Sequence, residues 1–96
     1  MQAAAAPDSL DQPLGVRALS KLKWRCRRGL LENDLFIARF FERHESSLTV
    51  RQAEAMGTLM DLSDHDLLDL FLQRKEPEPA QAGADVIDLL RLMRVS

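Results

Sequence analysis

The 96-residue sequence contains few of the residues on which catalytic and metal sites usually depend. Cys26 is the only cysteine, so an internal disulfide is excluded and no Cys/His cluster indicates a metal site. There is no tyrosine, the only histidines are His44 and His65, and the sequence has no glycine-rich phosphate loop. These absences favour a protein that binds another protein over an enzyme, and we expect no stably bound cofactor.

Long apolar runs are missing as well. No run approaches the roughly 20 residues that cross a bilayer as a helix, so we expect no membrane insertion. The start, Met-Gln-Ala-Ala-Ala-Ala, lacks the basic segment and the long apolar stretch of a secretory signal, which makes a cytoplasmic location the expectation. Two prolines and an alanine run predict a flexible tail over residues 1–14, followed by one helical domain over residues 15–96.

Apolar residues recur at helical spacing in five stretches, and no window alternates as a strand would. The stretches are residues 16–26, 30–45, a third opened by Thr49, a fourth capped by Ser63, and 84–94, with a loop over 74–83. The faces expected to be buried include Val16, Leu19, Leu22 and Cys26, then Leu35, Phe36, Ile37, Phe40 and Phe41, and later Val86, Leu89, Leu90 and Met93. The sequence therefore predicts an all-α fold, a compact bundle of five short helices.

Two local features refine this prediction. Thr49 followed by Gln52 has the spacing of a capping box, in which each side chain bonds the other residue's backbone amide. Gly57 lies inside the third helix, where glycine costs about 1 kcal/mol relative to alanine. We therefore expect another helix to cross closely at Gly57.

Charge is unevenly distributed along the chain. The formal net charge is −2, yet residues 17–28 carry six cations while the chain after Gly29 is acidic. Such a segment can bind nucleic-acid phosphates, so a small helical nucleic-acid-binding regulator using residues 17–28 is the alternative function. A protein-docking surface is favoured, because no second helix rich in Arg, Asn or Gln follows the basic segment.

The segment Trp-Arg-Cys-Arg-Arg-Gly-Leu-Leu-Glu-Asn-Asp, residues 24–34, carries a more specific signal. It resembles the signature of the succinate dehydrogenase assembly factors, the bacterial SdhE group and its mitochondrial relatives. Their Arg-Gly-x-x-Glu motif, after a basic helix with an aromatic residue, is matched here by Arg28, Gly29 and Glu32. The resemblance also includes an acidic residue two positions after the motif glutamate, which here is Asp34.

The resemblance continues beyond the motif. The stretch Phe40-Phe41-Glu42 and the acidic helix start over residues 61–68 extend it across roughly residues 17–76. One departure is Leu70, where many relatives carry tryptophan, and this puts an aromatic contact from that helix in doubt.

The resemblance implies a five-helix chaperone-like factor without catalytic residues. Its partner would be the flavoprotein subunit of succinate dehydrogenase, and that of fumarate reductase, to which it promotes covalent attachment of FAD. It would act as a monomer or weak dimer. The implied partner-binding residues are Trp24, Arg27, Arg28, Gly29, Glu32 and Asp34. From the residues alone, Gly29 is better explained as a helix breaker and Arg28 with Glu32 as an i,i+4 pair, and it is the resemblance that favours the docking roles.

Overall fold

The computed structural model describes residues 10–27, 29–77 and 79–95, with the backbone alone for 79–82. Within these ranges the chain forms five α-helices and one 3-10 turn and no strand, which confirms the all-α prediction. The elements are α2 (Val16–Arg25), α3 (Leu31–His44), η1 (Glu45–Ser47), α4 (Val50–Met60), α5 (Asp64–Phe71) and α6 (Pro79–Val95). No helix in the described ranges has the length and apolar character needed to cross a membrane.

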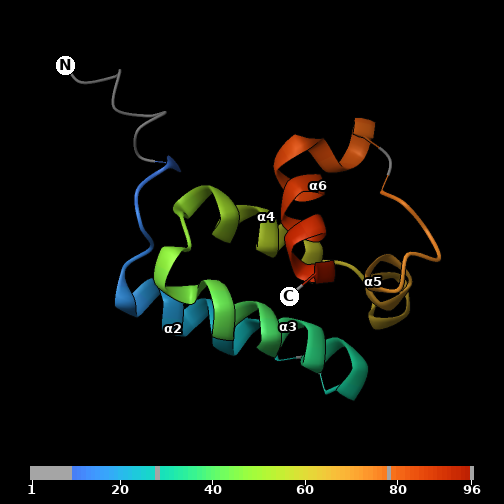
Figure 1. Ribbon diagram of the computed structural model, residues 1–96, viewed down its shortest axis with the longest axis horizontal. Coiled ribbons are helices and arrows are strands. Elements are labelled where there is room, and N and C mark those ends of the chain that lie inside the picture. Colours follow the sequence, from blue (N-terminus) through green and yellow to red (C-terminus); the bar gives the residue numbers. More distant parts are fainter. Residues whose placement is uncertain (1–9, 28, 78, 96) are drawn as a thin grey trace.

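The helices surround a single core to which α3 contributes centrally. Figure 1 shows α2 and α3 along one long edge of the bundle, α6 crossing α4 above them, and α5 at the end away from the N-terminal segment. Helix α3 packs against both α5 and α6, and α4 packs against α6. The largest fully buried apolar side chains are Phe40, Leu48, Met56, Leu59, Leu67, Leu89, Leu90 and Met93.

The predicted caps are present. The Thr49 side chain accepts a hydrogen bond from the Gln52 amide at 3.2 Å, and the Gln52 side chain accepts one from the Thr49 amide at 3.0 Å. Ser63 Oγ accepts from the Asp66 amide at 3.1 Å and so starts α5. These bonds satisfy amides that have no partner inside their own helices, which is why α4 and α5 begin where the sequence indicated.

The N-terminal segment differs from the prediction. The Leu14 amide donates to Leu48 O at 2.8 Å, and the Val50 amide donates to Gln12 O at 3.0 Å, so the chain before α2 is fastened to the start of α4. Residues 12–14 of the segment expected to be a flexible tail are therefore bonded to the helical domain, residues 1–9 lie outside the described part, and the boundary at residue 14 stays a prediction. Backbone pairing with a distant segment, helped by the half-buried Leu14, accounts for the difference.

A side-chain clamp strengthens the same region. Arg51 of α4 donates to Asp11 at 3.2 Å and to Asp85 of α6 at 3.4 Å. These two hydrogen bonds raise the pKa of Arg51 above its ordinary value, so this side chain is charged under all physiological conditions. The clamp joins the N-terminal segment, α4 and α6.

Two further expectations are corrected. Val16, expected in the core, is 83% exposed, because it lies six residues before the buried Leu22 and so points about 120° away from it around the helix. The loop expected over 74–83 is shorter, since α6 already begins at Pro79, a residue type compatible with a first helical turn. Gly83 then interrupts this helix with a φ of 75°, and regular α-helix continues after Gly83 to Val95.

Candidate docking site at the α2–α3 junction

The junction between α2 and α3 is built around Gly29. This residue has a φ of 89°, in the left-handed region that side-chain-bearing residues rarely adopt. Its amide donates to Asp34 Oδ2 at 3.3 Å, which links the junction to the first turns of α3. A β-carbon at Gly29 would meet no atom within 4 Å, so the backbone here is open to an approaching molecule. Arg28, the first residue of the predicted motif, lies outside the described residues.

The acidic residues of the motif lie at the start of α3. Glu32 and Asp34 are in its first turn, where negative charge interacts favourably with the helix dipole. Glu32 is exposed and makes no hydrogen bond or ion pair with the described part of the chain, whereas Asp34 is half-buried and holds Gly29. Glu32 therefore presents its carboxylate to solvent at the start of α3, and Asp34 shapes the junction.

Trp24 and Arg27 form an exposed pair at the end of α2. Trp24 is 71% exposed, and the Arg27 guanidinium carbon lies 5.0 Å from the centroid of its ring. This cation–π contact contributes about 0.5–1 kcal/mol at an exposed site. It also leaves a large aromatic surface in contact with water, as is common where a protein binds a partner.

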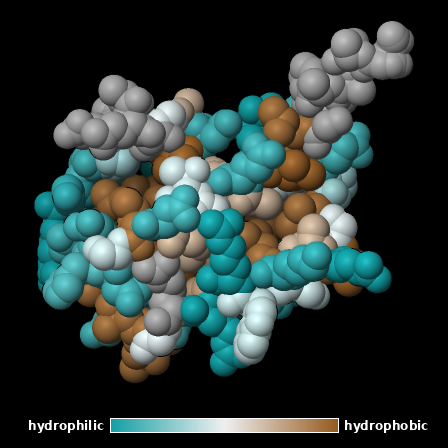
Figure 2. Space-filling view, turned by 180° about the vertical axis from the view of Figure 1, so that it is seen from behind, coloured by the Kyte–Doolittle hydropathy of each residue, from teal (hydrophilic) through white to brown (hydrophobic). Residues whose placement is uncertain are grey.

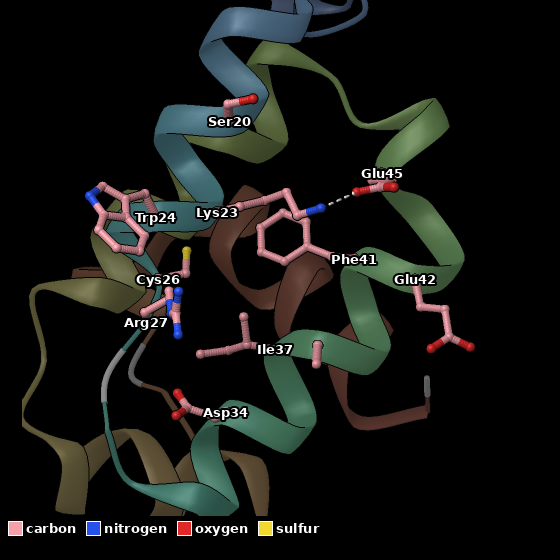
Figure 3. A pocket seen from close by; sticks show the side chains of 11 residues that line it. Ser20, Lys23, Trp24, Cys26, Arg27, Asp34, Ile37, Phe41, Glu42 and Glu45 are labelled. Atoms are coloured by element: carbon pink, nitrogen blue, oxygen red, sulfur yellow. Dashed lines mark hydrogen bonds and ion pairs between the residues drawn. The ribbon is translucent and has the colours of Figure 1, made fainter.

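A groove runs between α2 and α3, beside the junction, with a volume of about 590 Å³. Figure 3 shows Trp24 and Arg27 on its α2 side, Ile37 and Asp34 on its α3 side, and Cys26 between them. We call this cavity the α2–α3 groove. Its floor is apolar, and Cys26, 1% exposed, belongs to that floor, as the apolar spacing of the first helix indicated.

An ion pair closes one end of the α2–α3 groove. Lys23 Nζ of α2 lies 2.8 Å from Glu45 Oε1 of η1, and the same ammonium lies 5.9 Å from the centroid of the Phe41 ring (Figure 3). Neither Lys23 nor Glu45 was predicted as a site residue, because 22 residues separate them and no local pattern connects them. The one sequence signal for this end of the groove was Phe41, which belongs to the Phe-Phe-Glu stretch of the resemblance.

The structure thus brings the predicted residues together in two adjoining places. Trp24, Arg27 and Asp34 line the α2–α3 groove, while Gly29 and Glu32 form the junction beside it. The histidines are not among the residues lining the groove: His44 packs against Phe40 with ring centroids 5.1 Å apart, and His65 is exposed on α5. Among the described residues, no three potential metal ligands cluster.

The basic segment is partly neutralised within the chain. Besides the Lys23–Glu45 pair, Arg25 Nη2 lies 3.1 Å from Oδ1 of Asp61, which follows the end of α4, and the guanidinium of Arg25 covers Gly57. The close helix crossing expected at Gly57 is therefore not what is found, because the space beside this glycine is filled by the end of the Arg25 side chain. Because both cations already face carboxylates, they are poorly placed to track a phosphate backbone.

A helical bundle with an exposed junction and a groove of mixed apolar and charged character has the form of a protein-docking module. The family described as the flavinator of succinate dehydrogenase has a model that matches residues 20–94, and this chain belongs to that family.

Several known proteins are similar to the chain over most of its length. The "FAD assembly factor SdhE" of Ralstonia nicotianae is 48% identical over 75 residues, which cover 78% of this chain and 79% of the relative. The proteins of the same name from Coxiella burnetii and Pseudomonas aeruginosa are 38% and 32% identical, covering 75% and 80% of this chain and 84% and 83% of the relatives. No solved structure matches the chain. The comparisons give no support to the nucleic-acid alternative.

Proposed function

We propose that this chain is an FAD assembly factor that docks on the flavoprotein subunit of succinate dehydrogenase and promotes covalent attachment of FAD. The observation that carries the proposal is the α2–α3 junction, where the motif glycine holds a φ of 89° and faces open space. The lack of a side chain at such a site lets a partner's backbone come close to this backbone. The family membership supports the choice of client.

The proposed mechanism is positioning. A covalent flavin bond requires the ring methyl group of FAD and a histidine of the client to be held in a reactive geometry. A factor that fixes mobile parts of its client raises the fraction of time spent in that geometry, without supplying a reacting group itself. In this proposal the acceptor histidine and the bound FAD belong to the client, so the chain acts as a chaperone and not as an enzyme.

Within the site, each residue has a distinct part in the proposal. Gly29 allows the close approach, and the exposed Glu32 carboxylate makes charge-assisted hydrogen bonds with the client. Trp24 supplies apolar contact area with its orientation fixed by Arg27. The proposal extends to the flavoprotein subunit of fumarate reductase as a second client, to a monomer or weak dimer as the active form, and to the cytoplasm as its location.

The test is co-expression with the cognate flavoprotein subunit in cells that lack their own factor, followed by denaturation and in-gel flavin fluorescence. The variants are Gly29→Arg and Glu32→Ala, with Glu54→Ala, an exposed carboxylate of α4, as the control. We expect strong fluorescence with wild type and the control, a large loss with Gly29→Arg and a partial loss with Glu32→Ala. Equal fluorescence in all lanes, including one without the factor, would refute the proposal.

A further inference from the structure

An apolar stripe lies on the outer side of α3, next to the proposed docking junction. Leu31 is 68% exposed, Leu35 is 46% exposed, and Ala38 is also exposed. These three residues are spaced four and three apart, which places them on one side of the helix. We call them the α3 stripe. Figure 2 shows hydrophobic surface at the lower left, where the start of α3 projects from the body of the molecule.

The α3 stripe and the α2–α3 groove form one continuous surface. Ala38 belongs to the stripe and also lines the groove, whose buried floor contains Ile37 and Phe41. Trp24 forms the opposite wall. Single exposed leucines are common on protein surfaces and require no explanation. Here the exposed Leu31 and Leu35 lie between the Gly29 junction and the α2–α3 groove with its apolar floor. A contiguous exposed apolar surface of this kind is typical of an interaction site.

The α2–α3 groove also has a charge pattern that an occupant must match. Among the charged residues that line it, Lys23 is paired with Glu45, and Asp34 accepts from the Gly29 amide. In the described part of the chain, Arg27 has no carboxylate partner and Glu42 has no partner of any kind. Among the described lining residues, the groove therefore offers one cation, Arg27, and one anion, Glu42, to an occupant. Arg27 lies near Asp34, and Glu42 stands eight residues further along α3, about 12 Å at 1.5 Å per residue.

We infer that the α3 stripe and the α2–α3 groove dock one amphipathic helix of the client flavoprotein, an inference that rests on the proposed function. Two adjacent helices leave a seam into which a third packs at 8–10 Å, and the small Ala38 permits that approach. The occupant's apolar face covers the stripe and the groove floor. Its basic residue pairs with Glu42 and its acidic residue with Arg27, which fixes its direction along α3. Docking then extends from the Gly29 junction along α3.

A matched pair of substitutions tests where the client helix lies. Ala38→Trp fills the α2–α3 groove, whereas Ala18→Trp places the same side chain in the separate groove between α2 and α4. Both alanines are exposed, so both variants keep the fold, which circular dichroism verifies. With purified apo-flavoprotein subunit, we expect Ala38→Trp to raise Kd at least about tenfold, the range of hot-spot disruption, and Ala18→Trp to leave it within about twofold.

Charge reversal tests the polarity of the occupant. Glu42→Lys should raise Kd about tenfold at low salt, and the difference from wild type should shrink as ionic strength screens the pair. Glu54→Lys, on α4 and outside the α2–α3 groove, is the control and should bind as wild type does. An unchanged Kd for Glu42→Lys would overturn the assigned direction of the helix.

The outcomes separate this inference from the proposed function. If wild type stimulates flavin attachment but Ala38→Trp binds normally, or only Ala18→Trp is impaired, the docking inference is wrong and the assembly role stands. If wild type binds the subunit, Ala38→Trp weakens that binding, and no flavin attachment is stimulated, docking stands and the assembly role is refuted. If wild type neither binds nor stimulates, both are refuted.

Discussion

Gly29 allows the two possible roles of the motif glycine to be separated by experiment. Its φ of 89° would strain any other residue, with a cost of about 1–2 kcal/mol for alanine. Because a β-carbon there meets nothing within 4 Å, no steric clash adds to this cost in the free protein. Asparagine tolerates the left-handed region better than alanine. The strain therefore predicts that stability decreases in the order Gly, Asn, Ala at position 29.

The magnitude is measurable in a domain of this size. A loss of 1 kcal/mol lowers the Tm of a 60–100-residue domain by about 4–8 °C. Gly29→Ala should therefore unfold at least about 4 °C below wild type, and Gly29→Asn in between, when thermal unfolding is followed by far-UV circular dichroism. A Tm for Gly29→Ala equal to that of wild type would show that the strain argument is wrong.

Client binding should follow a different order. If a backbone of the flavoprotein subunit approaches position 29, affinity should fall with side-chain volume, in the order Gly, Ala, Asn, Arg. Calorimetric titration of the apo-flavoprotein subunit, well below the Tm of every variant, measures this order without interference from unfolding. If Gly29→Asn binds more tightly than Gly29→Ala, then Gly29 acts by setting the shape of the junction, and close approach of the client is refuted.

Three further substitutions test the fold. Gly57→Ala should change stability by less than about 1 kcal/mol in a urea titration, because the gain in helix propensity offsets displacement of the Arg25 guanidinium, which lies 3.1 Å from the added carbon. Leu89→Ala, at a side chain that is 1% exposed, should cost about 2–5 kcal/mol in the same titration, and a smaller loss would contradict its place in the core. Asn33→Asp puts a carboxyl at a fully buried position beside Asp64, so its folded-state pKa rises. The variant should therefore lose stability relative to wild type as pH increases from about 4 to about 7, and a parallel pH dependence would refute this.

Local signals in the sequence predicted the helices and their starts well. The capping box at Thr49 and the cap at Ser63 involve residues three apart, so a short window contains the whole interaction. The turn at Gly29 is equally local, because the left-handed conformation belongs to a single residue. The junction could for this reason be placed from the sequence alone.

Interactions between distant residues could not be predicted in the same way. The Arg51 clamp joins positions 40 and 34 residues apart, and no spacing rule connects an arginine to such partners. The Lys23–Glu45 pair at the end of the α2–α3 groove was missed for the same reason. The spacing of Val16 from Leu19 placed it on the buried face of its helix, but spacing alone does not say which side of a short helix is buried, and that side is centred on Leu22.

The way α2 is attached has a consequence for how the docking site responds to its surroundings. Leu22 is the only buried residue within this helix, Leu19 and the adjoining Cys26 pack into the core beside it, and two exposed ion pairs, Lys23–Glu45 and Arg25–Asp61, add to its attachment. Exposed pairs of this kind contribute about 0–1 kcal/mol each and weaken as salt is added. One wall of the α2–α3 groove is thus held in part by ion pairs that salt weakens, while Leu19, Leu22 and Cys26 hold it by apolar packing that salt does not weaken. Added salt should therefore loosen the Lys23–Glu45 end of the α2–α3 groove, while the apolar floor at Cys26 stays packed.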